Sequence, residues 1–390
     1  MQEIKPGYKQ TEVGVIPEDW RLDSLGHVLT LQRGFDLPKR LRRRGPVPIV
    51  TSSGIEDFHN QAAAKGPGII TGRYGTIGKV HFVETEYWPL NTTLWVRDFH
   101  GNDPRWGYRV LQTVDFLSHS GKSGVPGVNR NDVHGELVLV PTLPEQRAIA
   151  AALADADSLI AALEGMIAKK RDLKQAAMQH LLTGRTRLPG FSGEWEVKRL
   201  GDLGSFLKGR GISRDQAQSG DIPCVRYGEI YTVHHDVIRS FASRISREVA
   251  ETATPIRYGD LLFAGSGETK EEIGKCVALG THAEAYAGGD IVILRPKVGD
   301  PFFLGYLMNT SSVVRQKANF GQGDAVVHIS ARALANIEIT LPDPTEQTAI
   351  AEVLSDIDAD LAALEAQAAK ARAVKQGMMQ ELLTGRVRLV

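Results

Sequence analysis

Residues 145–188 read EQRAIAAALADADSLIAALEGMIAKKRDLKQAAMQHLLTGRTRL, and residues 346–389 read EQTAIAEVLSDIDADLAALEAQAAKARAVKQGMMQELLTGRVRL. The second stretch repeats the first at an offset of 201 residues (145 to 346) without a gap. A chain that carries one long segment twice is expected to have pseudo-two-fold architecture.

Both copies follow the heptad pattern of a coiled coil. In the first copy, positions 149, 153, 156, 160, 163, 167, 170, 174, 177 and 181 alternate in steps of four and three and are mostly apolar. The matching positions of the second copy, from Ile350 to Leu382, do the same. More than four heptads predict two long helices whose seams must be buried, and the obvious partner of each is the other copy. Gly184 and Gly385 follow as stop signals.

Charge along the two copies indicates the direction of pairing. Each copy is acidic in its first half, as at Asp157 and Asp358, and basic in its second half, as at Lys174 and Lys375. Antiparallel pairing sets each acidic half against a basic half. The helix dipole alone would place the charges in the same way. We predict the antiparallel arrangement.

The segments around the helices are rich in glycine and contain short β-type runs such as 94–96, 137–140 and 291–294. Helices are expected at 105–118 and 301–316. We therefore predict an α+β fold with two mixed α/β domains, joined by two long helices that form a pseudo-two-fold antiparallel coiled coil. The predicted domains are residues 1–143 and 185–343, and the predicted helices are residues 144–184 and 344–390.

Composition places few limits on function. The 390 residues have a formal net charge of zero, which argues weakly against a general polyanion binder, although local patches decide such contacts. There are only two cysteines, Cys224 and Cys276, which fits a reducing compartment. The sequence lacks an apolar run of the roughly 18–20 residues that span a bilayer, and it lacks a signal peptide. We expect a soluble cytoplasmic protein without membrane contact.

Motifs of catalysis are absent from the sequence. Gly78-Lys79 and Gly274-Lys275 have neither the upstream glycine nor the following Ser or Thr of a phosphate-binding loop. The hydrolase, zinc-protease and dinucleotide-binding patterns are missing as well. His234-His235 has no plausible third ligand. We expect no catalytic residue, no metal and no cofactor in this chain.

Two glycine-rich segments, 68–80 and 259–277, share the order strand, loop, Ile-Gly-Lys, strand. The glycines would let the backbone approach a ligand, and Arg73, Tyr74 and Lys275 would suit phosphates and base edges. A tight β-turn with solvated charges explains the same pattern equally well. The loops at 120–130 and 319–324 are candidates for base reading or for ordinary connections.

The most basic stretch is residues 39–44, with five cations in six residues between glycines and prolines. A contact with a polyanion is favoured over a solvated loop. The second block has Lys208, Arg210 and Arg214 at the corresponding place.

These features together resemble the specificity (S) subunits of type I restriction-modification systems, over essentially the whole chain. The resemblance rests on Gly14-Val15-Ile16-Pro17-Glu18-Asp19-Trp20, on the block ends at 140–146 and 341–347, and on the repeated Leu-Leu-Thr-Gly-Arg at 181–185 and 382–386. Each motif is modest alone, but their order and duplication are specific.

The resemblance implies that each block is a target recognition domain that reads one half of a bipartite double-stranded DNA sequence. The helices would act as a spacer, and the unequal blocks imply an asymmetric target. Two modification (M) subunits would dock on the helices and carry S-adenosylmethionine. Two restriction (R) subunits would add ATP- and magnesium-dependent translocation and cleavage. Half-site centres about 34–36 Å apart would match one helical turn of DNA.

The candidate DNA contacts are Arg33, Lys39, Arg40, Arg42, Arg43, Arg44, Ser52, Ser53, Arg73, Tyr74, Lys79, Lys122, Asn129, Arg130, Lys208, Arg210, Arg214, Arg226, Tyr227, Ser266, Lys270, Lys275, Gln322 and His328. Three alternatives remain at this point. One is the specificity module of a related methylation-based defence system. The others are a scaffold that binds only proteins and an enzyme such as a nuclease with an unfamiliar site.

Overall fold

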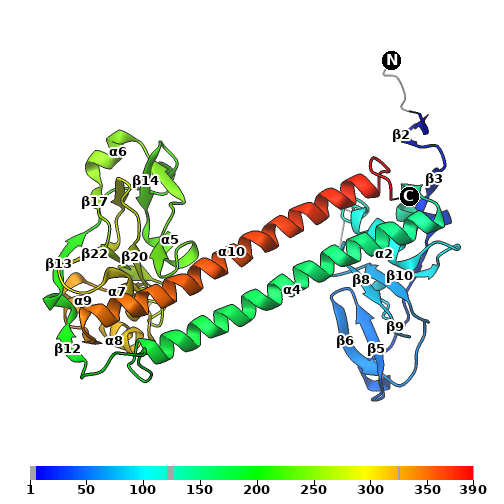
Figure 1. Cartoon of the computed structure of the whole chain (residues 1–390). Helices are drawn as coiled ribbons and strands as arrows, with labels where there is room; N and C mark the ends of the chain where they lie inside the picture. Colours follow the sequence, from blue (N-terminus) through cyan, green and yellow to red (C-terminus); the bar gives the residue numbers. More distant parts are fainter. Residues whose placement is uncertain (1–5, 121–125, 324–325, 390) are drawn as a thin grey trace. The chain divides into compact units, whose positions relative to one another are not determined.

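The structure, a computed structural model, describes residues 6–120, 126–323 and 326–389. Two helices of 39 residues each, α4 (Leu143–Leu181) and α10 (Pro344–Leu382), confirm the repeated long helix (Figure 1). The chain divides into two compact units. The first unit consists of Met1–Glu164 and Ala366–Val390, and the second unit is Gly165–Glu365. Each unit therefore contains one half of α4 and one half of α10.

The two helices are antiparallel within each unit. Five ion pairs join α4 to α10, and the 201-residue offset relates two pairs of the first unit to two pairs of the second. The related pairs are Glu164–Arg372 and Asp157–Lys375 in the first unit, and Glu365–Arg171 and Asp358–Lys174 in the second, at 2.5 to 2.7 Å. The fifth pair, Lys170–Asp360 at 2.6 Å, lies in the second unit. The predicted orientation is confirmed. Glu164–Arg372 and Glu365–Arg171 are exposed and contribute at most about 1 kcal/mol each, so they select the orientation more than they stabilise it.

The heptad seam is buried at some of its positions and half-buried at others, such as Ile160 and Ala177. Ile149 and Leu153 on α4, with Ile350 and Leu354 on α10, are at most 1% exposed and pack into the domain cores. Both helices end shortly before a glycine in the left-handed region, Gly184 at φ +69° and Gly385 at φ +71°. Residues other than glycine rarely adopt this backbone conformation, which is why the helices stop at these points.

The two units share one sheet topology. In the first unit the larger sheet has the order β4 (Thr30–Arg33), β10 (Thr93–Asp98), β7 (Gly68–Gly72), β8 (Val80–Val83). In the second the order is β13 (Gly204–Lys208), β22 (Ile291–Pro296), β18 (Leu261–Ala264), β20 (Cys276–Leu279), β15 (Val237–Ile238). The glycine-rich segments thus connect β7 to β8 and β18 to β20, which pair antiparallel, as their shared pattern predicts.

A smaller sheet is repeated as well. It runs β6 (Gly54–His59), β5 (Val47–Thr51), β9 (Trp88–Pro89) in the first unit. In the second it runs β16 (Ser243–Ile245), β14 (Ile222–Val225), β21 (Ala285–Ala287), β17 (Thr254–Ile256). Two-stranded pairs complete each unit: β1 (Tyr8–Thr11) with β2 (Gly14–Pro17), β3 (Arg21–Ser24) with β11 (Leu137–Val140), β12 (Glu196–Arg199) with β24 (Glu338–Leu341), and β19 (Ser266–Gly267) with β23 (Val327–His328).

Short helices accompany the sheets. The first unit has α1 (Leu25–Val28), η1 (Lys39–Leu41), α2 (Pro104–Thr113) and α3 (Arg130–His134). The second has η2 (Leu200–Asp202), η3 (Asp215–Ala217), α5 (Tyr227–Thr232), α6 (Arg247–Thr252), α7 (Pro301–Leu307), α8 (Ser311–Phe320) and α9 (Ala331–Ala335). The expected helix at 301–316 is two helices, because α7 ends at Leu307 and α8 begins only after the extended residue Thr310, whose hydroxyl donates to the Leu307 carbonyl. The expected helix at 105–118 ends at Thr113.

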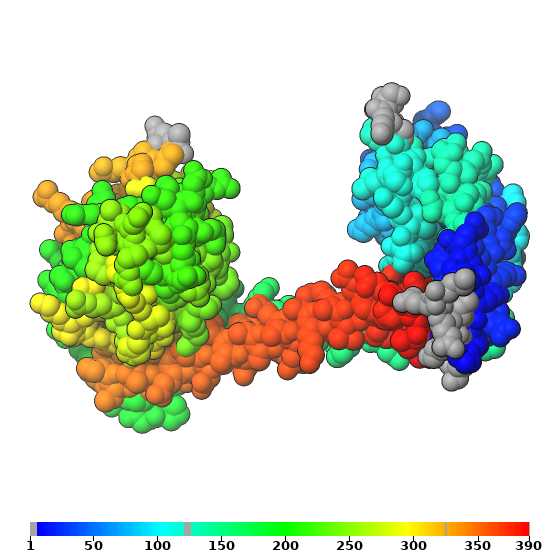
Figure 2. Space-filling model, turned by 90° about the horizontal axis from the view of Figure 1, so that it is seen from above, coloured from blue at the N-terminus to red at the C-terminus, as the bar shows by residue number. Residues whose placement is uncertain are grey.

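Buried carboxylates tie the long helices to the rest of each unit. Glu145 accepts bonds from Arg388 and from the indole nitrogen of Trp20, the latter at 2.8 Å. Glu346 accepts the equivalent bonds from Arg187. The C-terminal end of the first unit therefore contacts its N-terminal segment, as in the bond from Arg388 to Asp19 at 2.8 Å. Figure 2 shows the red C-terminal stretch near the blue N-terminal stretch.

One lysine is buried in the core of the second unit. Lys317 of α8 is 1% exposed, and its Nζ donates to the carbonyl oxygen of Gly274 at 2.7 Å. Burial lowers the pKa of Lys317 to about 8. Between about pH 8 and the ordinary pKa of lysine, Lys317 is therefore protonated in the unfolded chain and neutral in the folded chain. The second unit should gain stability as the pH rises through that window.

We expect Lys317→Met to stabilise the second unit by about 1–2 kcal/mol at pH 7, because it removes a buried charge at the cost of one hydrogen bond. Urea unfolding of both proteins at pH 7 and at pH 10 would measure this. The advantage of the variant should shrink at pH 10, where the wild-type lysine is neutral. An equal difference at both pH values would contradict the assignment.

Candidate nucleic-acid interface

The first unit has a pocket of about 260 Å³ beside the end of β4, the loop after β7 and the start of α3. Five of the predicted contact residues line it. The lining residues are Arg33, Arg73, Tyr74, Leu94, Gly127, Val128, Asn129 and Arg130. Segments that are about 100 residues apart in the sequence thus supply one cationic site.

Backbone bonds hold this pocket together. The amide of Arg73 donates to the Thr92 carbonyl at 2.9 Å, and the Arg73 carbonyl accepts from Val128 at 2.9 Å. The guanidinium of Arg73 lies 4.6 Å from the centre of the Tyr74 ring, a cation–π contact. Asn129 caps α3 through its side chain. An arginine stacked on an aromatic ring is held in a defined orientation, which suits recognition of a planar group.

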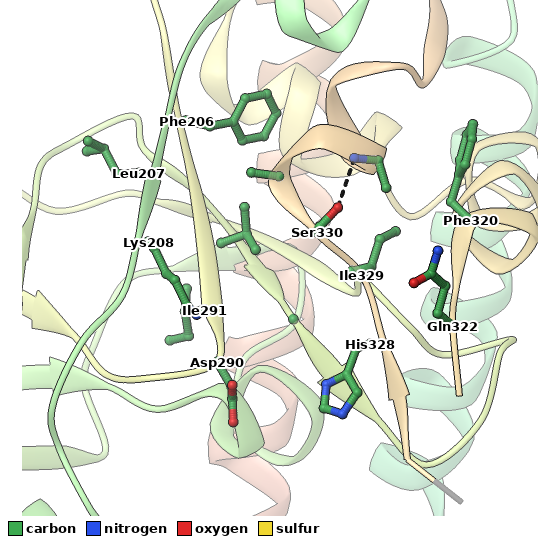
Figure 3. A pocket seen from close by; sticks show the side chains of 14 residues that line it. Phe206, Leu207, Lys208, Asp290, Ile291, Phe320, Gln322, His328, Ile329 and Ser330 are labelled. Carbon is green, nitrogen blue, oxygen red and sulfur yellow. Dashed lines mark hydrogen bonds between the residues drawn. The ribbon is translucent and has the colours of Figure 1, made fainter. Parts of the chain in front are cut away.

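The second unit has a pocket of about 430 Å³ at the end of β13, beside β22, β23 and the start of α9 (Figure 3). Three predicted contact residues, Lys208, Gln322 and His328, line it. The other polar side chains of the lining come from Asp290 and Ser330, and Phe320 adds an aromatic ring.

The polar residues of the second pocket are linked through the backbone. Gln322 and His328 exchange two backbone hydrogen bonds, at 2.8 and 3.0 Å. The ring Nδ1 of His328 lies 2.9 Å from the hydroxyl of the buried Ser266, which leaves its other nitrogen available for a ligand. The amide of Gly265 donates to the Asp290 carbonyl at 2.7 Å. The glycine-rich loop therefore sits between the histidine and the aspartate.

The two pockets occupy the same place in the repeated fold. The bond from Val128 to Arg73 in the first unit has its counterpart in the bond from Ile329 to Gly265 in the second, at 2.9 Å in both. Arg33 and Lys208 are the last residues of the equivalent strands β4 and β13. The backbone is repeated while the side chains differ. Three arginines line the first pocket, whereas the second combines a lysine, a histidine, an amide and a carboxylate.

A duplicated scaffold with different residues at an equivalent site matches one known family. The model for the type I restriction modification DNA specificity domain matches residues 17–170 and 192–371. The chain belongs to this family. Each match covers one domain and most of the long helix that follows it.

Individual relatives agree with this assignment. Over 98% of its length the chain is 24% identical to a putative type I restriction enzyme MjaX specificity subunit of Methanocaldococcus jannaschii, covering 97% of that protein. It is 23% identical to the MjaVIII specificity subunit of the same organism, over 72% of this chain and 69% of that one.

Solved structures share the fold. The S subunit of a type I restriction-modification system from M. genitalium has a TM-score of 0.65 at 14% identity, with 97% of this chain and 99% of that chain covered. A chain from a study of complex assembly and conformational transition of the type I R-M system has a TM-score of 0.54 at 18% identity. That match covers 95% of this chain and 99% of the other.

The basic stretch 39–44 lies on an exposed loop that includes η1, outside the pocket. Lys39, Arg40, Arg43 and Arg44 are exposed. Arg42 differs, since its side chain is 9% exposed and pairs with Glu56 at 3.3 Å and Asp57 at 3.1 Å. Together with the backbone bond from Phe58, this arginine lowers the pKa of Asp57. One of the five cations is thus already neutralised within the chain.

The remaining candidates of the first unit lie near its pocket or outside the described residues. The Ser52 hydroxyl accepts from the amide of Thr76, so Ser52 supports the loop that carries Arg73. Ser53 lies in the exposed turn between β5 and β6, and Lys79 is exposed just before β8. Lys122 falls within residues 121–125, which the structure does not describe.

The other candidates of the second unit have varied surroundings. Arg210, Arg214, Tyr227 and Lys270 are exposed, but they are not part of the pocket lining. Arg226 lies 3.8 Å from Glu229 at the start of α5.

Lys275 donates to the carbonyls of Tyr231 and His234, and burial lowers its pKa. These contacts tie the end of the glycine-rich loop between β18 and β20 to the segment 231–234, so Lys275 supports that loop.

Sequence reasoning missed Asp290 and Ser330, whereas Phe320 lies in the loop 319–324 that was a candidate for base reading. Asp290 follows Gly288-Gly289 and precedes the apolar run 291–294, so a turn before a strand was the available signal. Among the described residues, no group of three His, Cys, Asp or Glu side chains could hold a metal ion. None of the helices in the described ranges is long and apolar enough to cross a membrane.

Proposed function

We propose that this chain gives a type I restriction-modification enzyme its DNA specificity by reading an asymmetric bipartite target. Each unit reads one half of the target through its pocket and the surrounding loops. The antiparallel helices set the spacing of the halves and carry the docking sites of two methyltransferase subunits. The observation that carries this proposal is the equivalent pocket, which has the same backbone bonds and different side chains in the two units.

Physical reasoning supports reading of two different sequences. Direct readout depends on the donors and acceptors that a protein presents to base edges. Arg33, Arg73 and Arg130 present only donors. Asp290 presents only an acceptor, and Gln322 presents both. Two sites with such different groups suit different base pairs, so the target should not be palindromic.

The chemistry of modification and cleavage would belong to partner subunits. Two methyltransferase subunits would bring S-adenosylmethionine, and two restriction subunits would bring ATP and magnesium. In this proposal the chain itself is non-catalytic, holds no cofactor or metal, and works in the cytoplasm. Its zero net charge implies that DNA affinity also needs contacts from the methyltransferase subunits.

Methylation mapping is the test. The chain would be produced together with its methyltransferase subunit, and methylated adenines in the host genome would be located by sequencing. We expect one motif with two different halves and a spacer of fixed length. A palindromic or continuous motif would overturn the bipartite reading. Methylation without sequence preference, or none with an active methyltransferase, would overturn the specificity role.

The basic loop offers a matched pair of variants. We expect Arg44→Ala to reduce the slope of log affinity against log salt by about 0.9, the value for one lost phosphate contact. Arg42→Ala should leave the slope unchanged, because Glu56 and Asp57 already neutralise Arg42. DNA binding by the assembled methyltransferase at several salt concentrations measures both slopes. Equal slopes for Arg44→Ala and the wild type would exclude this loop from the interface.

A further inference from the structure

Asp290 is an unusual residue to find in a pocket that faces DNA. It is exposed, it lines the second pocket, and Figure 3 shows its carboxylate at the pocket together with Lys208 and His328. A carboxylate repels phosphate groups and lowers general affinity for DNA. Its presence therefore needs a partner other than the DNA backbone.

The backbone at Asp290 is strained. Its φ is +58°, and only two other non-glycine residues of the described ranges, His100 and Ile212, have a positive φ. The equivalent residue in the first unit is Thr92, because the Thr92 carbonyl accepts from Arg73 as the Asp290 carbonyl accepts from Gly265. Thr92 is not among the positive-φ residues. A positive φ costs a non-glycine residue about 1–3 kcal/mol, with aspartate at the low end, and such residues often cluster at functional sites.

The surroundings of Asp290 fix which DNA groups it can meet. The Gly265–Ser266 segment bonds to the Asp290 carbonyl on one side and to His328 and Ile329 on the other. Gln322 is joined to His328 by two backbone bonds. The site thus presents an obligate acceptor close to side chains that both donate and accept. Among DNA groups, the exocyclic amines of cytosine (N4) and adenine (N6) are the donors in the major groove.

We propose that Asp290 reads an exocyclic amino group of cytosine or adenine in the half-site bound by the second unit. This inference rests on the proposed function. In the first unit the equivalent residue, Thr92, has a buried hydroxyl and does not line the pocket. That pocket is lined by three arginines and, among the described residues, by no carboxylate, so it favours guanine, whose major-groove edge offers two acceptors.

The test compares three variants of the chain, each produced with the methyltransferase subunit and mapped by genome-wide methylation sequencing. Asp290→Asn removes the charge and keeps the shape, and asparagine tolerates a positive φ. Asp290→Gly removes the side chain and relieves the strain. Asp221→Asn, at an exposed aspartate that is not part of this pocket's lining, is the control.

Asp290→Gly should lose discrimination at one position of one half-site by about ten- to hundredfold, with the other half unchanged. Asp290→Asn keeps one acceptor oxygen, so its loss at the same position should be smaller. The identity of the relaxed base separates cytosine from adenine. Asp290→Gly should also raise the melting temperature. A variant that lost discrimination because it folded poorly would have a lower melting temperature instead. Unchanged discrimination in both variants would overturn the role of Asp290 and leave the bipartite motif standing. A wild type without a bipartite motif would instead refute the proposed function.

Discussion

Glu145→Ala is expected to lower the free energy of unfolding of the first unit by roughly 3 kcal/mol. The Glu145 carboxylate is 1% exposed and accepts from Arg388 at 2.7 and 2.8 Å and from Trp20 at 2.8 Å. Its removal leaves the cation and the indole without their acceptor. The value is at the low end for a broken buried ion pair, because the Arg388 side chain remains 20% exposed.

Hydrogen exchange resolved along the chain measures this effect where it arises. Protection should fall around Trp20, the start of α4 and the C-terminal end of α10, and it should persist in the second unit. The matched variant is Glu346→Ala, which breaks the equivalent bonds to Arg187. This variant should destabilise the second unit. Its loss in the free energy of unfolding should be smaller, because no bond joins Trp195 Nε1 to the carboxylate there. Equal protection of the first unit in Glu145→Ala and the wild type would be inconsistent with this role.

A seven-residue insertion in both long helices is expected to change which DNA is methylated. Duplicating residues 161–167 and 362–368 preserves the heptad seam and lengthens each helix by about 10 Å, which corresponds to about 3 bp of DNA. Methylation at the wild-type target should fall at least a hundredfold, since a misplacement of even 1 Å can have such an effect. A motif with the same two halves and a longer spacer should replace it.

Genome-wide methylation mapping detects both outcomes in one experiment. The control is the duplication in one helix alone. It shifts the register, so that Asp157–Lys375 and Asp358–Lys174 cannot both form, and it should lower the melting temperature. If the double duplication folds, methylates and keeps the wild-type spacer, then the helices do not set the spacing.

The long helices and their orientation could be predicted from the sequence because their determinants are local and periodic. Ile149 and Leu153 recur at heptad spacing, and the charges of Asp157 and Lys375 have complementary positions along the two copies. Each residue needs only its neighbours along one helix to define a face, and a face of this length needs a partner. The structure confirms the pairing through the five ion pairs between the two helices.

The loops were harder to interpret. The pattern shared by residues 68–80 and 259–277 correctly indicated strand, loop and strand, but it left readout and a simple turn equally plausible. Five cations at 39–44 looked alike in the sequence, yet Arg42 is paired with carboxylates on β6 that follow it by 14 and 15 residues. Such partners depend on how two strands pair, which the local sequence does not specify.

The sequence by itself determined the duplication, the coiled-coil seam and the antiparallel sense, because periodic burial and charge order act along single helices. Only the tertiary structure decided which side chains share a pocket. Arg33, Arg73 and Arg130 come together because β4, β7 and α3 meet through hydrogen bonds between distant segments. Asp290 enters its pocket through one left-handed residue that no periodicity reveals. Non-local backbone bonds and single-residue conformations carry no repeating signal, so the fold had to supply them.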